Sequence, residues 1–423
     1  MNKKILIVDF ALIGSSGGGH SEAYFLNFVS ILIRNNYEVY ACCANNQRLR
    51  EKLEEQGLIN QCTVIDFHPL LPEKLLFRGW KIIDWFLEKI PNCEPIKFTS
   101  LYNLLAVKRL FKQLGEEIPV FFAHVDSMIP AVPTLISKRF MPKKWSGLYV
   151  IPSYKGRLYF SEQARKMRFY KEKNFSLSSC QAILVLHPLY RRFLKKRIKE
   201  LNSIDIPELV EIPELKDSNQ EPEINEELLH QIKQLVKGRK IISFLGNITL
   251  RKNILLFLES ASLLDPEKYF ILVLGRLKGK DKPEVAAQLN QIQEYQKLLT
   301  GNSYIDLDYF ITNETEFSRL VSLSDVIFLH YQKFPYSSNM LTRAMAHRKP
   351  VIVNKGYVME KTVKTYNWRE AVESNPHQIA KSMEELSAPT FSIEEHSYQS
   401  FISNHSPEAF EASTLKAVNN LYQ

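Results

Sequence analysis

Short apolar segments alternate with helical segments along nearly the whole chain. In the first half the apolar segments are KILIVDF, YEVYACCA, CTVIDF, PVFFAHV, GLYVIP and AILVLHP. They are rich in β-branched and aromatic residues and are continuously apolar, which is typical of parallel strands buried on both faces. Helical periods such as EAYFLNFVSILIRNN lie between them. This pattern predicts an α/β fold with a doubly wound parallel sheet.

The alternation stops once and then restarts. Residues 202–237 begin with an acidic, proline-containing stretch that is typical of a connection between domains. A second series of apolar segments follows, from KIISFLG to PVIVN. A chain of 423 residues is also longer than a single compact domain usually is. We therefore expect two Rossmann-like domains, residues 1–205 and 206–405, and a closing helix over residues 406–423.

The composition indicates which kinds of ligand and partner the chain could bind. The net charge is +9, and basic residues concentrate in YRRFLKKRIK, which favours an anionic partner. No recognisable nucleic-acid-binding module accompanies these residues, so no nucleic acid is expected. The five cysteines contain no CxxC pair, and no aspartate cluster has metal-binding spacing. We expect a cytoplasmic protein without a metal, a disulfide framework or a membrane-spanning segment.

A glycine-rich run, GSSGGGHSE, joins the first apolar segment to the first helical one. It nearly matches a nucleoside triphosphatase loop, but His20 stands where that loop needs a lysine. It also nearly matches the dinucleotide fingerprint, but Glu22 occupies the third glycine position, where it would crowd the helix and repel pyrophosphate. The remaining interpretation is a tight turn that needs glycine for its backbone angles.

The second half changes this interpretation. Two Rossmann-like domains, the glycine turn, FLGNITLRKN and RAMAHRKPVI together resemble the GT-B fold, and within it the retaining glycosyltransferases of family 4. That family has a G-R-L-x-x-x-K-G element whose arginine and lysine hold the nucleotide-sugar diphosphate. In this sequence Gly246 and Lys252 keep their places, Asn247 replaces the arginine, and Arg251 precedes the lysine. A cationic pair at a helix start suits a diphosphate on physical grounds as well.

The family's Glu-x7-Glu element is changed. Its two glutamate positions fall on Pro335 and Arg343. Between them a helix start carries Ser337, Ser338 and Asn339, whose side chains could cap the helix or hydrogen-bond sugar hydroxyls and phosphate. Arg343 could meet a phosphate or pair with an acidic residue. The resemblance therefore implies a donor site formed by Gly246, Asn247, Arg251, Lys252, Ser337, Ser338, Asn339 and Arg343.

In the N-terminal domain the resemblance reaches two segments. Gly17, Gly18, Gly19 and His20 would form the acceptor-side loop of a central cleft between the domains. His124 and Asp126, in FFAHVDSM, would lie at the carboxyl end of a parallel strand, the edge where α/β sheets bind ligands. They are the catalytic candidates, and a structural histidine is the alternative.

The resemblance implies retaining, metal-independent transfer of a sugar from a nucleotide-sugar, with no other cofactor, to a hydroxyl of a polysaccharide, a lipid-linked acceptor or another glycoconjugate. The alternative is an inactive GT-B protein that binds sugar or serves as a scaffold. Residues Leu71 to Ile90 combine tryptophans with lysines and would suit a helix at an anionic membrane surface, although a core-facing helix explains the same composition. Peripheral membrane association is therefore a further hypothesis.

Overall fold

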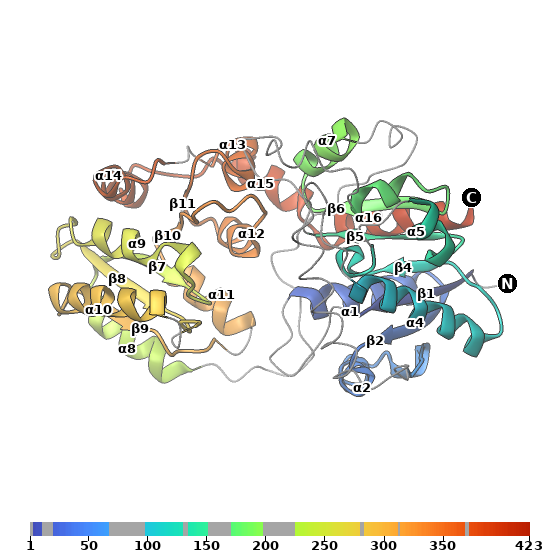
Figure 1. Cartoon of the computed structure of the whole chain (residues 1–423). Helices are drawn as coiled ribbons and strands as arrows, with labels where there is room; N and C mark the ends of the chain where they lie inside the picture. Colours follow the sequence, from blue (N-terminus) through green and yellow to red (C-terminus); the bar gives the residue numbers. More distant parts are fainter. Residues whose placement is uncertain are drawn as a thin grey trace. The chain divides into compact units, whose positions relative to one another are not determined.

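The computed structural model describes residues 3–10, 20–66, 98–129, 134–150, 171–197, 225–279, 283–311, 314–368 and 372–423. The chain divides into two compact units (Figure 1). The first unit contains Met1–Val210 and Pro407–Gln423, and the second contains Glu211–Ser406. The last segment of the chain therefore packs with the first unit.

The described part of the first unit contains a six-stranded sheet with the order β3-β2-β1-β4-β5-β6. Every pair of neighbouring strands is parallel. The direction of winding reverses between β1 and β4, and ligands bind at such switch points in open α/β sheets. The strands are β1 (Lys3–Asp9), β2 (Tyr37–Cys43), β3 (Cys62–Val64), β4 (Val120–Phe122), β5 (Trp145–Tyr149) and β6 (Cys180–Val185).

Continuous apolarity explains why β1 lies in the middle of this sheet. Ile5 to Val8 are completely buried, so both faces of the strand are covered. Its register with β2 runs from Lys3 opposite Tyr37 to Asp9 opposite Cys43. The helices of this unit are α1 (His20–Arg34), α2 (Asn46–Glu55), α4 (Phe98–Leu114), α5 (Thr134–Phe140), α7 (Pro188–Arg197) and α16 (Pro407–Asn419), with short 3-10 helices η1 (Ile59–Gln61), η2 (Val125–Ser127), η3 (Lys171–Ser176) and η6 (Asn420–Tyr422).

The C-terminal helix α16 completes the core of the first unit. The Phe410 ring, which is completely buried, stacks on Tyr24 and Phe28 of α1 at centroid distances of 6.0 and 5.4 Å. Glu411 accepts hydrogen bonds from Arg34 and Asn35 at the end of α1, at 2.9 and 2.8 Å. Figure 1 shows α16 in red beside the blue and teal elements of this unit.

The described part of the second unit contains a five-stranded parallel sheet with the order β11-β10-β7-β8-β9. Its switch point lies between β7 and β10. The prediction of two parallel-sheet α/β domains is thus confirmed. The strands are β7 (Lys240–Leu245), β8 (Tyr269–Leu274), β9 (Ser303–Asp306), β10 (Val326–Leu329) and β11 (Val351–Val353).

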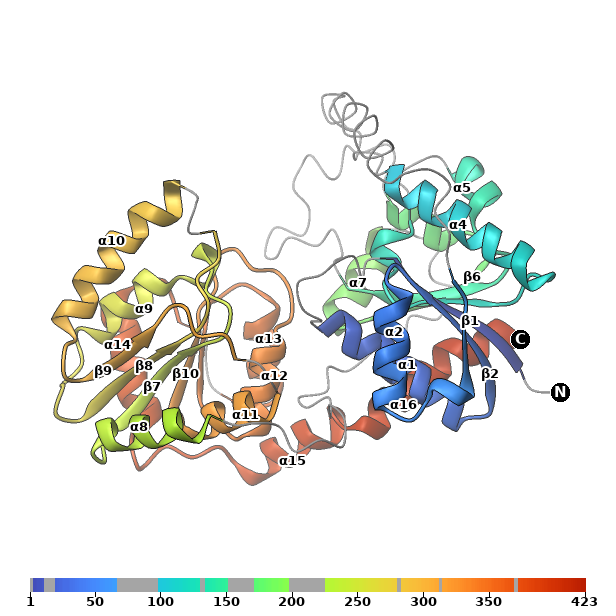
Figure 2. The same cartoon turned by 90° about the horizontal axis from the view of Figure 1, so that it is seen from below.

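Two apolar cores cover the two faces of this sheet (Figure 2). One core includes side chains of α8, α11, α12 and α13, and the other includes side chains of α9, α10 and α14. Asn225 and Asn375 cap α8 and α14, each accepting a backbone hydrogen bond from the first turn. The helices are α8 (Glu226–Val236), α9 (Ile254–Ala261), α10 (Pro283–Leu298), α11 (Glu314–Leu323), α12 (Asn339–Ala346), α13 (Val358–Thr365), α14 (Pro376–Ser387) and α15 (Glu395–Asn404), and η5 (Leu250–Lys252) is a 3-10 turn.

The two segments with predicted membrane affinity differ in what can be described. The segment Leu71 to Ile90 lies outside the described residues. The basic segment forms α7, which buries Tyr190, Phe193 and Leu194 and exposes Arg191 and Arg192. Among the described helices, none combines the length and the apolarity needed to cross a membrane.

Candidate functional site

Two glycines shape the backbone at the switch point of the second unit. Gly246 follows β7 with φ +87°, a left-handed conformation that favours glycine. Gly275 follows β8, and a Cβ atom on it would lie 1.9 Å from the carbonyl oxygen of Gly246. The segments after β7 and β8 can therefore pass this close to each other only because Gly275 lacks a side chain. Gly275 was missed in the sequence, where its one signal is a glycine directly after a buried strand.

Lys252 directs its ammonium group toward this glycine crossing. It ends η5, and its Nζ lies 3.7 Å from the position that a Cβ of Gly246 would occupy. The same atom lies 5.5 Å from the centre of the Tyr331 ring, which follows β10. Burial, together with a smaller effect of the neighbouring Arg251 charge, lowers the pKa of Lys252 to about 8. An anion bound here would oppose both effects on the pKa, because a nearby negative charge favours the charged form of the lysine.

Arg251 joins the η5 turn to the loop after β10. Its exposed guanidinium lies 4.1 Å from the centre of the Phe334 ring, and its carbonyl accepts a 2.8 Å hydrogen bond from the Gln332 N–H. The Gln332 side chain also donates to Oδ1 of Asn253, the left-handed residue before α9. Arg251 is therefore held beside Lys252 just before the start of α9. Asn247 is exposed in the same loop.

The start of α12 lies on the other side of the switch point. Ser338 occupies its N-cap position with an extended backbone, but its side chain makes no capping hydrogen bond. The hydroxyl instead hydrogen-bonds the Tyr331 phenol, whose pKa burial nevertheless raises to about 12. The capping interpretation of Ser338 is therefore wrong for its side chain. Ser337 and Asn339 are partly exposed beside it.

Arg343 lies inside the unit and not at its surface. It is 1% exposed, and its guanidinium is 4.5 Å from the centre of the Phe317 ring. The Phe317 ring in turn lies 3.3 Å from the position of a Cβ on Gly246. The Phe317 ring therefore lies between the Arg343 guanidinium and Gly246. Direct contact with a phosphate at the surface does not fit this position.

A buried acid–histidine pair lies at the switch point of the first unit. Asp9 ends β1, His124 follows β4, and Oδ2 of Asp9 lies 2.5 Å from Nδ1 of His124. Asp9 is fully buried and His124 is 7% exposed. Burial lowers the pKa of His124, but the hydrogen bond and charge of Asp9, with the charge of Asp126, outweigh it and raise the pKa above its usual value. Nδ1–H donates to the carboxylate, so Nε2 is the nitrogen left for a ligand.

Asp126 lies close enough to influence His124 but has a different partner. It belongs to η2, and its Oδ2 accepts a 2.8 Å hydrogen bond from the Val150 N–H after β5. Asp126 therefore connects the carboxyl ends of β4 and β5 near the histidine. The partner of His124 is Asp9, which sequence reasoning missed. Its signal was a charged residue directly after the buried apolar run Ile5 to Val8.

The predicted glycine loop cannot be placed in the same way. Gly17, Gly18 and Gly19 lie outside the described residues, and His20 is the first residue of α1, with its side chain also outside them. Among the residues that the structure does describe, no group of three or more histidine, cysteine, aspartate or glutamate side chains is placed to hold a metal ion.

A family model matches one part of the chain. The family model described as "Glycosyl transferases group 1" matches residues 225–399, which form most of the second unit. No curated protein matches the chain by sequence.

Solved structures resemble the whole chain. A glycosyltransferase from Rickettsia africae is 14% identical, with a TM-score of 0.64 over 100% of this chain and 99% of that one. Sucrose-phosphate synthase from Thermosynechococcus elongatus is 13% identical, with a TM-score of 0.64 over 100% and 99%. Anabaena HepE in complex with UDP-glucose is 12% identical, with a TM-score of 0.61 over 98% and 99%. Residues 225–399 therefore match the glycosyl transferases group 1 family, and the chain has the GT-B fold of the glycosyltransferase structures that it resembles.

Proposed function

We propose that the second unit binds the diphosphate of a nucleotide-sugar at the loop between β7 and α9. The observation that carries this proposal is the position of the Lys252 ammonium beside Gly246, at the switch point of the unit that matches the family. A glycine without a side chain lets an anion approach the backbone, and a partly buried lysine supplies the charge. The UDP-glucose complex of Anabaena HepE supports a donor of this class.

In the proposed reaction an acceptor hydroxyl attacks the anomeric carbon, and the nucleoside diphosphate leaves. Negative charge develops on the leaving phosphate, where Lys252, Arg251 and the N–H groups at the start of α9 would stabilise it. These cationic groups could do what a metal ion does in other transferases, so we propose transfer that needs no metal. We also propose that the anomeric configuration is retained, as in the family that the sequence resembles.

We propose that the switch point of the first unit binds the substrate through His124. Asp9 fixes the ring so that Nε2 can hydrogen-bond a sugar or acceptor hydroxyl, and the carboxylate stabilises the imidazolium when the ring takes a proton. Asp126 would act as a positioning residue, because its carboxylate is bonded to the Val150 backbone. Gly17 to His20 remain the proposed acceptor loop.

A thermal-shift screen tests the donor proposal directly. UDP, GDP and ADP and their glucose conjugates are added to the full chain, and a ligand at 100 times its Kd stabilises the folded state by about 2.7 kcal/mol. We expect one nucleotide family to raise the melting temperature. No shift with any of these nucleotides at millimolar concentration would contradict the donor site.

The chemistry is tested with the nucleotide-sugar that the screen selects. Proton NMR of the first product gives the anomeric configuration, and we expect it to match that of the donor. Turnover in EDTA should equal turnover in added magnesium. Inversion of the anomeric centre, or loss of turnover in EDTA that magnesium restores, would refute the corresponding part of the mechanism.

The acceptor proposal is a glycan or a lipid-linked sugar, reached by a cytoplasmic protein that can dock on an anionic membrane. Arg191 and Arg192 of α7 are exposed and would face the lipid headgroups. Sedimentation with vesicles of anionic and of neutral phospholipid tests this. We expect binding to the anionic vesicles at low salt, weaker binding after Arg191→Glu, and no binding to the neutral ones. Equal recovery in the supernatant with both vesicle types would exclude membrane docking.

A further inference from the structure

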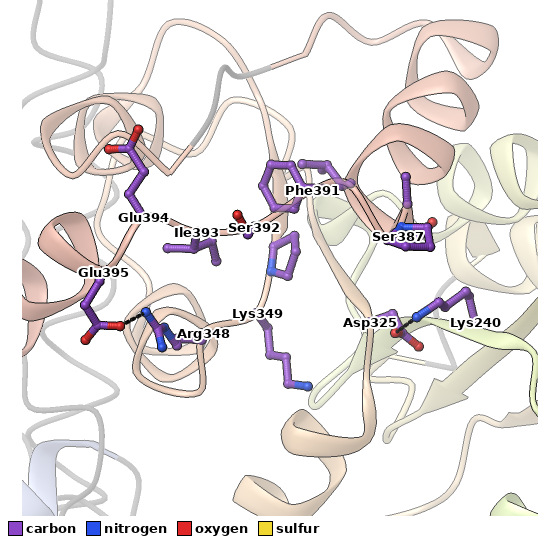
Figure 3. Close-up of a pocket in the computed structure, with 14 residues that line it drawn as sticks. Lys240, Asp325, Arg348, Lys349, Ser387, Phe391, Ser392, Ile393, Glu394 and Glu395 are labelled. Carbon is purple, nitrogen blue, oxygen red and sulfur yellow. Dashed lines mark hydrogen bonds and ion pairs between the residues drawn. The ribbon is translucent and has the colours of Figure 1, made fainter.

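A cavity lies at the amino-terminal edge of the second sheet, opposite to the edge that carries Lys252. Its volume is about 640 Å³, within the range of about 300 to 1,000 Å³ that is typical of small-molecule sites. It is lined by the first residue of β7, the residues that precede β10 and β11, and the segment that connects α14 to α15 (Figure 3). All of these residues belong to the second unit.

Three cationic side chains line the cavity, and two of them have acidic partners. Arg348 forms an ion pair with Glu395, and Lys240 forms one with Asp325 at 3.0 Å. The second carboxylate oxygen of Asp325 accepts a 2.8 Å hydrogen bond from the Ile241 N–H, so both of its oxygens are engaged. These two pairs appear as dashed lines in Figure 3.

Lys349 is the third cation. Among the described residues, its ammonium has no hydrogen-bond or ion-pair partner, although the side chain is partly buried. Burial lowers the pKa of Lys349, Asp325 opposes this shift, and Lys240 reinforces it. In Figure 3 the side chain lies between the two ion pairs. Six charged side chains line the cavity, three cationic and three acidic, and Lys349 is the cation that has no ion-pair partner among them.

The backbone of Lys349 is held rigidly, so the position of its side chain is defined. Arg348 before it has the left-handed φ of 54° that ends α12. The Lys349 N–H donates to the Ala344 carbonyl at 2.8 Å, and its own carbonyl accepts a 3.0 Å hydrogen bond from the buried Trp368 indole. A site on rigid elements can hold a ligand without first paying to order a loop.

The opposite wall of the cavity is largely apolar. Leu386 ends the buried face of α14, and Phe391 and Ile393 are partly exposed in the connecting segment. Ser392 adds an exposed hydroxyl. The carboxylate of Glu394 accepts hydrogen bonds from Asn367 and Ser397 at 3.3 and 3.5 Å, so it does not neutralise Lys349.

We propose that this cavity is a second ligand site, in which Lys349 binds the oxyanion of a small molecule whose apolar part packs on Phe391 and Leu386. The ligand class is an organic phosphate or carboxylate. An oxyanion would pair with the one lining cation that has no partner, and a ring or short chain would cover the apolar wall. This inference does not depend on the proposed transfer reaction, because the residues involved lie at the other edge of the sheet.

Isothermal titration of the full chain with phenyl phosphate tests the proposal, with benzoate as the carboxylate arm and benzyl alcohol as the uncharged control. We expect phenyl phosphate, benzoate or both to bind, and benzyl alcohol not to bind. Lys349→Met should weaken binding at least tenfold, whereas Lys349→Arg should largely retain it. Lys297→Ala, at an exposed lysine in the last turn of α10, should leave binding unchanged, and Lys252→Ala reports any binding at the donor edge. Binding that is lost in Lys252→Ala but kept in Lys349→Met would overturn the proposal, as would no binding of either anion to the wild type.

A second variant keeps the test decisive if Lys349→Met does not fold. Phe391→Ala removes a partly exposed ring from a connecting segment and should leave the fold intact. We expect it to weaken phenyl phosphate severalfold, because the phenyl group loses its apolar contact, and to leave binding of inorganic phosphate unchanged. Equal affinity of wild type and Phe391→Ala for phenyl phosphate would show that the cavity does not hold the ligand.

Discussion

The two sheets of this chain have related topologies but carry opposite chemistry at their switch points. In the first unit a buried carboxylate and a histidine end β1 and follow β4. In the second, a left-handed glycine follows β7, and a lysine and an arginine surround it. The parallel sheet supplies the same kind of edge in both cases. The comparison teaches that the same kind of edge can carry very different side chains, and under the proposed function one edge handles a proton while the other holds a negative charge.

The largest expected effect comes from removing the charge at the second switch point. Lys252→Ala should lower turnover by roughly 100-fold, since one such donor contributes on the order of 3 kcal/mol to transition-state stabilisation. The measurement is kcat with the donor found in the screen, with Lys268→Ala as the control because Lys268 is an exposed lysine before the amino end of β8. Unchanged turnover in Lys252→Ala, with the same melting temperature as wild type, would show that the charge of Lys252 does not contribute to the reaction.

The second largest effect concerns the Asp9–His124 pair at the switch point of the first unit. The folded pKa of His124 is raised, so its pairing with Asp9 stabilises the fold below the unfolded pKa of about 6.5, and this contribution is lost as pH rises through the folded value. Asp9→Asn removes a hydrogen bond between charged groups, which typically contributes about 2 kcal/mol. The loss of unfolding free energy should therefore be larger at about pH 5 than at about pH 8, and NMR titration should give His124 a lower pKa.

Asp66→Asn is the matched control for this variant. Asp66 forms an exposed ion pair with Arg50 at 2.8 Å, and exposed pairs contribute about 1 kcal/mol or less. A loss in Asp9→Asn that does not change between the two pH values would mean that the pair acts only through packing.

The third effect separates backbone strain from ligand access. Gly246→Ala and Gly301→Ala introduce a side chain at nearly the same backbone angle, φ +87° and +89°. Each should cost about 1 to 2 kcal/mol of stability, because alanine is strained in the left-handed region. A Cβ on Gly301 meets no atom within 4 Å, whereas one on Gly246 points toward Phe317 and Lys252. Only Gly246→Ala should weaken nucleotide binding. Equal nucleotide affinities in the two variants would refute the proposal that a phosphate lies close to the Gly246 backbone.

The smallest effect concerns the pair of cations. The pKa of Lys252 is about 8, so donor binding should weaken as pH rises through this value and the lysine loses its charge. Arg251→Ala removes a like charge and should move the alkaline limb of binding to higher pH. It should also cost about 0.5 to 1 kcal/mol of stability through the lost contact with Phe334. If donor binding weakens at the same alkaline pH in Arg251→Ala as in the wild type, Arg251 does not influence the charge of Lys252.

Most of the fold could be predicted from the sequence, because each strand is a continuous apolar run. The predicted segment KILIVDF corresponds to β1 (Lys3–Asp9), and Tyr269–Gly275 corresponds to β8 (Tyr269–Leu274). The strand ends were less certain. The predicted strand Asp325–Tyr331 is shortened to Val326–Leu329, because the Tyr331 N–H turns back to bond the Leu329 carbonyl.

The site was predictable only where its residues are close in the sequence. Gly246, Arg251 and Lys252 lie within one loop, so their spacing could be compared with a known element. Asp9 and His124 are 115 residues apart, and only the pairing of β1 with β4 brings them together. The contact between Gly246 and Gly275 depends on the β7–β8 register, and its only trace in each local segment is a glycine directly after a buried strand.

The return of α16 to the first unit has a consequence for biosynthesis. The Phe410 ring that stacks on α1 is translated after the whole of the second unit. Until it emerges, Tyr24 and Phe28 lack their contact with Phe410, although the sheet beneath them is already translated. The first unit to be synthesised is therefore the last that can be completed, while the second unit carries its own core on a single continuous stretch of chain.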